Sequence, residues 1–217
     1  MGTKERKEKE RKRRKEQILS AAIGLVKEQG FDKTTMDQIA ERAELSKGTL
    51  YLYFRDKSAL HQSIKKKGLK IIHTEFLNIL QEDIPGAEVV RKMALSFTDF
   101  ILKNATFTRA MVLYEQSRQD KRDDYPIEKD CNHLKNELFM LIIRGLQIGI
   151  QDKSIHSNLH PKILGLHIAF ELQGILQYSI SSQNGHIPAL IKEQDMTIHQ
   201  MVDQFIQVQF KQQAENN

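Results

Sequence analysis

Two short helices joined by a three-residue turn are predicted near the N-terminus, and this pair constrains the fold more than any other feature. Thr35 and Gln38 form a capping-box pattern, and Ser46 is a second N-cap candidate, so helices are expected over about 36–43 and 47–53. Helices of about eight residues are unstable alone, so longer helices must brace them. We therefore expect a helix-turn-helix held inside a larger helical core.

Hydrophobic periodicity predicts the bracing helices and continues along the chain. A helix over about 15–29 ends before Gly30, which suits the residue after a helix, and Asp56 is an N-cap candidate for a longer helix over about 57–80. Neither a strand pattern nor an internal repeat is found, so the predicted class is all-α with about nine helices. The remaining helices are expected over about 85–103, 105–118, 127–152, 161–182 and 194–212.

Positive charge is concentrated at the N-terminal end of the chain. The net charge is +5, and residues 1–16 alone contain nine basic and four acidic residues. Residues 17–70 add ten basic and six acidic residues, whereas residues 71–217 carry a net charge of −4. Such asymmetry indicates a front end that faces a nucleic acid or a membrane. The segment 4–16 has no apolar residue, so it is either a frayed extension of the next helix or a flexible arm. It is either a solvated tail or an arm that contacts phosphates or a minor groove.

Composition excludes several classes of protein. A single cysteine, Cys131, allows no internal disulfide and no cysteine zinc finger, which fits the reducing cytosol. No apolar run resembles a signal peptide or a membrane span, so a cytoplasmic protein without membrane contact is expected. His156 and His160 are four apart but lie in a predicted loop with no accompanying carboxylate or cysteine. We expect no metal, no cofactor and, since no catalytic motif occurs, no enzyme activity.

One stretch of the chain combines a cap, a turn, an aromatic pair and a following lysine in order: Gly30-Phe31, Thr34-Thr35-Met36, Ile39-Ala40, Ala43, Leu45-Ser46-Lys47-Gly48-Thr49-Leu50-Tyr51, Tyr53-Phe54, Lys57 and Leu60. With these residues, about 45 positions from Ile18 to Ile64 strongly resemble the DNA-binding domain of the tetracycline-repressor (TetR) family. One departure is Glu44, which occupies a turn position where the family usually has Gly. A residue other than Gly in a left-handed turn costs roughly 1 kcal/mol.

The resemblance implies three regions: a basic tail over 1–16, a helix-turn-helix domain over 17–70, and a ligand-sensing and dimerisation domain over 71–217. It also implies that the recognition helix starts at Lys47 and that its first turn meets base edges in the major groove. The expected DNA-binding residues are Thr35, Ser46, Lys47, Gly48, Thr49, Tyr51, Tyr53 and Lys57.

The helices expected at the C-terminal end are apolar over more than one face, which suits burial against both the core and a second copy of the chain. A dimer interface is therefore expected at Leu172, Ile175, Leu176, Met201, Val202 and Phe205. By resemblance, the middle helices enclose a pocket for a small apolar or amphipathic ligand. Its expected lining is Phe97, Met111, Tyr114, Glu115, Phe139, Arg144, His167 and Phe170, with Gln173 as a further polar candidate.

The predicted function is that of a homodimeric transcriptional regulator, a repressor that a small molecule releases from a palindromic DNA operator. Ligand binding to one conformation of the dimer would change the separation of the two recognition helices. Other hypotheses remain at this point: a regulator controlled by a partner protein, a helical enzyme with a vestigial DNA-binding domain, and a basic protein that coats DNA without sequence preference.

Overall fold

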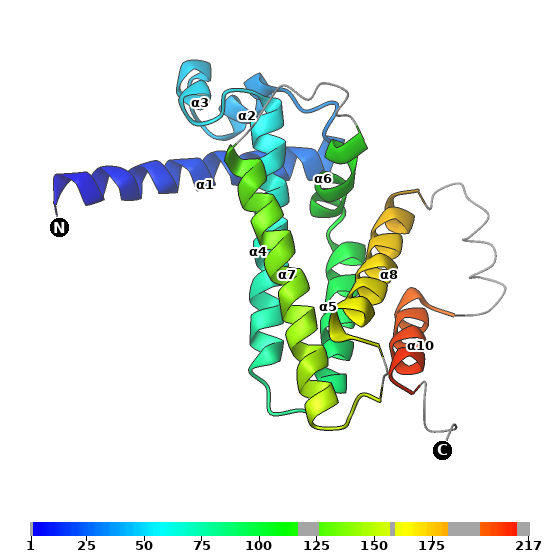
Figure 1. The fold of residues 1–217 in the computed structure, drawn as a ribbon. Coiled ribbons are helices and arrows are strands. Elements are labelled where there is room, and N and C mark those ends of the chain that lie inside the picture. Colours follow the sequence, from blue (N-terminus) through cyan, green and yellow to red (C-terminus); the bar gives the residue numbers. More distant parts are fainter. Residues whose placement is uncertain (1, 117–125, 157–158, 182–195, 212–217) are drawn as a thin grey trace.

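The computed structural model describes residues 2–116, 126–156, 159–181 and 196–211, and within these ranges it contains helices and no strand (Figure 1). The all-α prediction is therefore confirmed. The connections that the expected helices leave at 119–126 and 183–193 lie almost wholly outside the described residues. The helices are α1 (Thr3–Gln29), α2 (Met36–Arg42), α3 (Lys47–Tyr53), α4 (Lys57–Leu80), α5 (Gly86–Lys103), α6 (Ala105–Gln116), α7 (Pro126–Gln151), α8 (Pro161–Ser181) and α10 (Ile198–Lys211).

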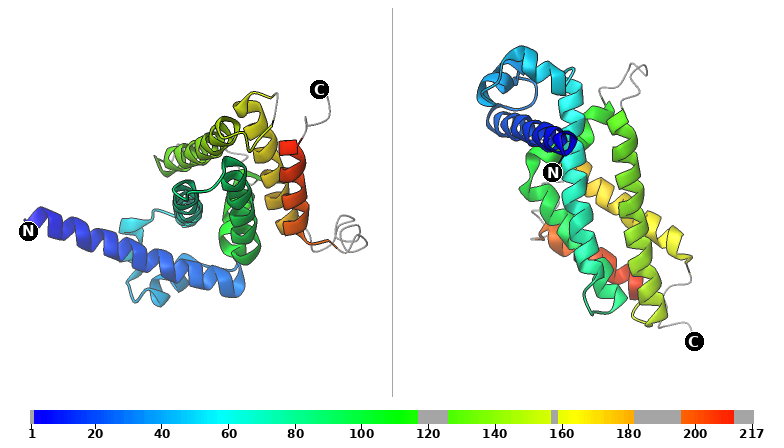
Figure 2. Two further views of the ribbon diagram at one scale, coloured as in Figure 1. Left: turned by 90° about the horizontal axis from the view of Figure 1, so that it is seen from below. Right: turned by 90° about the vertical axis from the view of Figure 1, so that its left-hand side faces the viewer.

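Helix α1 begins much earlier than hydrophobic periodicity predicts, because the polar segment 4–16 is also helical. Figures 1 and 2 show this N-terminal part projecting from the body of the molecule. Charged pairs along the helix support it: Glu10 contacts Arg13 at 2.7 Å and Arg14 at 3.3 Å. Of the two forms considered for the segment, a helix or a flexible tail, the structure shows the helix.

The first hydrophobic core joins α1, α2 and α3 to the N-terminal part of α4. The apolar stripe of α1 that begins at Ile18 packs against Ile39 and Ala40 of α2 and against Leu50 of α3. Leu60 and Ile64 close this core from α4. Short helices of the helix-turn-helix thus gain their stability from α1 and α4, as the sequence predicts.

The second core contains the rest of α4 together with α5 to α8 and α10. Leu69, Ile72 and Phe76 continue along α4 from the first core into the second, so this one helix belongs to both. Helix α10 is tied to α5, because Arg91 pairs with Asp203 and His199 Nε2 lies 2.6 Å from Asp99 Oδ1. Figure 1 shows α4 and α7 running side by side beneath the helix-turn-helix.

Helices α5 and α7 approach each other at their glycines. A Cβ added to Gly86 would lie 2.0 Å from the backbone nitrogen of Gly149, so no side chain fits there. This contact fixes the lower end of the second core. Among the described helices, none has the length and apolarity that a membrane crossing requires.

Candidate nucleic-acid interface and ligand cavity

Side-chain caps start both helices of the helix-turn-helix. Thr35 Oγ1 accepts the backbone N–H of Gln38 at 3.2 Å, and Gln38 Oε1 accepts the backbone N–H of Thr35 at 2.9 Å. Ser46 Oγ accepts the backbone N–H of Thr49 at 3.2 Å. The caps predicted at Thr35 and Ser46 are confirmed. Both residues are exposed, so the two helix starts face solvent.

The turn between α2 and α3 contains the left-handed residue that the sequence suggests. Glu44 has φ 53°, a conformation that favours Gly, and its backbone N–H donates to the carbonyl of Glu41 at 2.9 Å. Gln17 of α1 supports the same turn, because its Nε2 donates to the carbonyl of Ala43 at 2.9 Å. The strain at Glu44 is therefore tolerated within a hydrogen-bonded turn.

Helix α3 has one buried and one exposed face. Leu50 and the following Phe54 are 0% and 2% exposed, whereas Tyr51 and Leu52 are 43% and 78% exposed. Thr49 is half-buried. A short helix with its outer face free and its inner face anchored has the geometry needed to enter a major groove. Leu52 was not expected from the sequence, and its exposure marks it as a further candidate for contact with DNA.

The first turn of α3 contains a lysine, Lys47, and a glycine with open space around its backbone, Gly48. Lys47 Nζ lies 2.7 Å from Asp37 Oδ1, and this hydrogen-bonded carboxylate raises the pKa of the lysine. Both side chains are more than half exposed, so the pair is accessible to water and to a ligand. A Cβ added at Gly48 would meet no atom within 4 Å. The protein itself therefore does not require Gly at position 48.

Lys57, which the sequence places among the DNA-binding residues, makes two contacts within the protein. Its Nζ donates to the carbonyl of Asp32 at 3.1 Å and lies 4.5 Å from the centroid of the Phe31 ring. Partial burial lowers its pKa. The lysine thus braces the loop that precedes α2, and its side chain is less exposed than that of Lys47.

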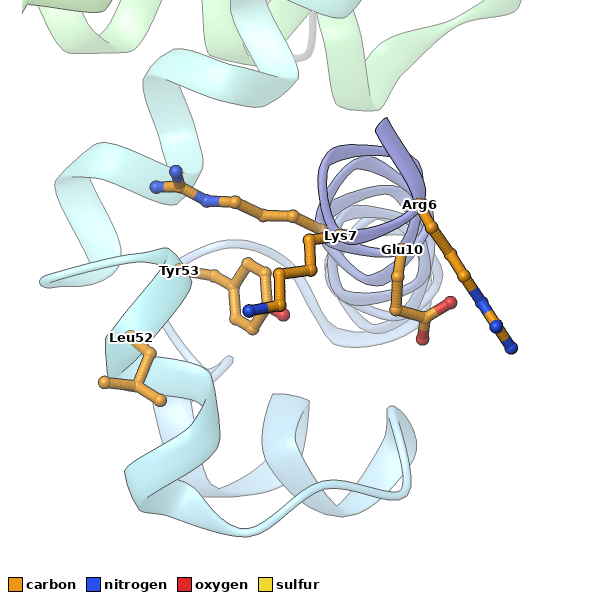
Figure 3. Close-up of a pocket in the computed structure, with 6 residues that line it drawn as sticks. Arg6, Lys7, Glu10, Leu52 and Tyr53 are labelled. Atoms are coloured by element: carbon orange, nitrogen blue, oxygen red, sulfur yellow. The ribbon is translucent and has the colours of Figure 1, made fainter. Parts of the chain in front are cut away.

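A basic hollow lies between α3 and the projecting part of α1. It has a volume of about 600 Å³, and Figure 3 shows Lys7 extending toward the ring of Tyr53 across it. A neighbouring hollow of about 610 Å³ continues along α1 and also reaches Tyr53. The charge count predicts a basic segment here but not its place beside α3. The first hollow is lined by Arg6, Lys7, Glu10, Arg11, Leu52 and Tyr53, and the second by Lys4, Lys7, Glu8, Arg11, Lys12, Lys15 and Tyr53.

A cavity of about 230 Å³ opens between α4, α5, α6, α7 and α8. Three of the residues expected in a ligand pocket line it: Phe97, Met111 and Phe139. Gln173 lines it as well, and so does Lys135, which the sequence gave no reason to select. Both polar residues are exposed, so they lie where the cavity opens toward solvent. The remaining lining is Leu69, Ile72, Phe76, Leu138, Ile142, Ala169, Leu172 and Leu176.

Three other residues expected in the pocket lie elsewhere. Arg144 is exposed on α7, and His167 and Phe170 are exposed on α8, where Phe170 is 70% exposed. The resemblance suggested a pocket among these helices, but both helices carry apolar residues on more than one side, so the sequence does not tell which side faces the cavity. The side chains of Tyr114 and Glu115 lie outside the described residues.

A groove of about 540 Å³ separates α8 from α10 and is partly apolar. His167 and Phe170 line it, together with the expected interface residues Ile175, Met201 and Phe205. The other three expected interface residues need correction, because they fill the core of the subunit. Leu172 and Leu176 are each 5% exposed, and Val202 is 1% exposed although it also borders the groove.

Titratable side chains form no evident metal site in the ranges that the structure describes. No three His, Cys, Asp or Glu residues lie there in an arrangement that could hold a metal ion. In the described residues the geometry therefore offers three features with a capacity to bind: the basic, exposed surface around α3, the apolar cavity beside α6, and the groove between α8 and α10.

The sequence model of a family described as "Bacterial regulatory proteins, tetR family" matches residues 18–64. The fatty acid metabolism regulator protein of Bacillus subtilis (strain 168) is 26% identical over 149 residues, which cover 68% of this chain and 73% of that protein. The uncharacterized HTH-type transcriptional regulator YerO of the same organism is 35% identical over 151 residues, covering 65% of this chain and 51% of that protein.

Solved structures share the fold along most of the chain. A TetR/AcrR-family transcriptional regulator from Thermobifida fusca YX-ER1 has a TM-score of 0.68 at 17% identity, covering 92% of this chain and 98% of that one. The transcriptional regulator FadR from Bacillus subtilis, solved in complex with stearoyl-CoA, has a TM-score of 0.62 at 15% identity. That match covers 90% of this chain and 97% of the FadR chain.

Proposed function

Since the chain belongs to the TetR family of transcriptional regulators, we propose that it is a homodimeric repressor that a small amphipathic ligand releases from a palindromic operator. The observation that carries this proposal is the outer face of α3, where Lys47, Gly48 and Tyr51 are exposed while Leu50 is completely buried. Such a face is suited to base edges and flanking phosphates.

A dimer is supported by the surface between α8 and α10. Ile163, Leu166 and Phe170 on α8, and Met201 on α10, are large apolar side chains that are at least 40% exposed. Glu171 lines the same groove, and burial raises the pKa of its carboxyl. Phe170 and Met201 both line the groove, and Ile163 and Leu166 precede Phe170 at helical spacing. Exposed apolar side chains grouped in this way indicate an interaction surface. A second copy seated on it would place two recognition helices on one face of a duplex, which makes a two-fold symmetric site readable.

An amphipathic ligand is supported by the cavity. Its lining is largely apolar, and Lys135 and Gln173 are the polar side chains among the residues that line it. Its volume of about 230 Å³ is below the range of about 300–1,000 Å³ that is usual for ligand pockets. The small volume, the apolar lining and the single lysine suit an apolar chain with an anionic head. The relatives add support, because one is named for fatty acid metabolism and one was solved with stearoyl-CoA.

The proposal is tested by selecting duplexes from a random 40-base-pair pool with the full chain. The expected product is a palindrome with half-sites about 34–36 Å apart, or a multiple of that distance. Titration with stearoyl-CoA, and separately with stearate, should then release the selected duplex. Failure to enrich any sequence would contradict sequence-specific regulation. Enrichment without release by either compound, and with no thermal stabilisation by them, would contradict this ligand class and favour control by a partner protein.

A further inference from the structure

The projecting part of α1 carries a basic stripe on the side that faces α3. Lys4, Lys7, Arg11 and Lys15 follow one another at spacings of three or four residues, which places them on one side of a helix. The same residues line the two hollows that α1 forms with Tyr53. The stripe therefore has a definite orientation relative to the recognition helix.

The acidic residues of this segment leave most of the stripe uncompensated. Glu5 accepts the backbone N–H of Gly2, Glu10 pairs with Arg13 and Arg14, and Glu16 lies 3.2 Å from Lys67 of α4. Glu8 lines the second hollow beside the stripe, where it offsets one of the four positive charges. Within the described part of the chain, neither Lys7 nor Arg11 takes part in an ion pair. These two side chains can therefore meet an external anion without first breaking an internal contact.

We propose that this stripe is a second DNA-contacting element, which binds the sugar-phosphate backbone beside the groove that α3 enters. This inference rests on the proposed function, in which α3 binds DNA, and adds a second surface of the protein that contacts the same DNA. Figure 3 shows Lys7 on the α1 side of the hollow and Leu52 and Tyr53, at the end of α3, on the other side. Arg11 lines the same hollow. A backbone strand that borders the major groove would lie along this hollow when α3 is docked.

The absence of apolar residues over 4–16 fits this role. A helix with no packed face gains little from the protein core, and its charges are placed for an external polyanion instead. An anionic membrane surface would attract the same charges, but the stripe faces the recognition helix and the segment offers no apolar face for insertion. The geometry thus favours duplex DNA over lipid.

The test compares two double variants of the full chain on the duplex selected by the wild-type protein. Lys7→Gln with Arg11→Gln removes two charges from the stripe. Lys9→Gln with Arg13→Gln removes the same charge from the opposite side, because each residue is two positions further on and about 200° around the helix. Arg14 still pairs with Glu10 in this control. Fluorescence anisotropy at several salt concentrations gives the slope of log affinity against log salt.

The stripe variant should lower the magnitude of that slope by about 1.8 for each subunit, at about 0.9 for each lost phosphate contact. The control should change the slope by less than half as much. Equal effects of both variants, or no effect of either, would overturn the proposal, since the segment would then act as diffuse charge or as a solvated tail. Binding to phosphatidylserine vesicles that only the stripe variant loses, with DNA binding unchanged, would also overturn it. If the wild-type protein selects no duplex at all, the proposed function itself has failed.

Discussion

Ala110 and Met111 are neighbours in α6, yet their side chains are buried in different cores. Ala110 is 2% exposed and packs with the helix-turn-helix, whereas Met111 is 5% exposed and packs in the second core. Met111 also lines the cavity, and its Cε would lie 2.8 Å from a Cβ added to Gly68 of α4. One turn of α6 therefore touches the cavity, the long helix α4 and the DNA-binding domain.

This relationship predicts that Met111 couples the cavity to DNA release. Met111→Ala should weaken the effect of stearoyl-CoA on DNA affinity severalfold, because a shortened side chain no longer transmits a shift of the cavity wall to α6. Leu138→Ala is the matched control, since Leu138 lines the same cavity from α7. The measurement is the ratio of the DNA dissociation constants with and without stearoyl-CoA. Equal loss of this ratio in both variants would contradict a special role for α6.

Gly48→Ala should separate stability from function. An added Cβ has open space in the protein, and Ala is favoured over Gly in a helix by about 1 kcal/mol, so the thermal midpoint should stay unchanged or rise. Affinity for the selected duplex should nevertheless fall by about tenfold or more, because the backbone of α3 could no longer approach the DNA closely. Thermal unfolding and anisotropy on the same sample check both parts. Undiminished affinity would show that no close approach occurs at Gly48.

Because His61 is buried, we expect the free energy of unfolding to fall in weak acid. Burial, with the charges of Lys65 and Lys57 nearby, lowers the pKa of His61 from 6.5 to about 4. The unfolded chain therefore binds more protons between pH 6.5 and 4, so stability is present above pH 6.5 and is lost as the pH falls through this window. The full shift corresponds to about 3 kcal/mol. Urea unfolding of the wild type and of His61→Phe from pH 7 to 4 checks this, because the wild type should lose up to about 3 kcal/mol of stability relative to the variant over this range. Equal losses in both proteins would contradict the prediction.

A substitution at Phe170 should disrupt dimerisation without disrupting the fold of the subunit. Because its side chain is 70% exposed in the subunit, Phe170→Asp should leave the helical circular dichroism unchanged while placing a charge in the proposed interface. Light scattering after size exclusion should show monomers at concentrations where the wild type is a dimer. Ile71→Asp is the control, since Ile71 is 44% exposed on α4, outside the α8–α10 groove. A dimeric Phe170→Asp protein would contradict this interface.

Structural features that depend on a few neighbouring residues, such as helix caps and turns, could be predicted from the sequence. The caps at Thr35, Ser46 and Asp56 were all predicted, and each accepts a backbone N–H in its own first turn. The strained turn at Glu44 was expected from the replaced Gly and has φ 53°. Such features depend on local backbone geometry, which the residue types themselves determine.

Features that depend on how helices face one another could not be read in the same way. Helix α8 is apolar on several sides, so periodicity could not separate Leu172, which fills the core, from Phe170, which is exposed. The polar segment 4–16 has no apolar period at all, and its helical form and place beside α3 follow from charge pairs and from continuation of α1. Lys135 was missed because only tertiary packing brings it to the cavity.

The central claim is that the outer face of α3 reads DNA. The most direct measurement is the affinity of Lys47→Ala and Tyr51→Ala for the selected duplex, with Lys103→Ala on α5 as a control for the loss of one lysine charge. Each α3 variant should weaken binding by about 1–3 kcal/mol for each subunit, with unchanged thermal stability, whereas the control should bind like the wild type. Wild-type affinity in both α3 variants would contradict the account.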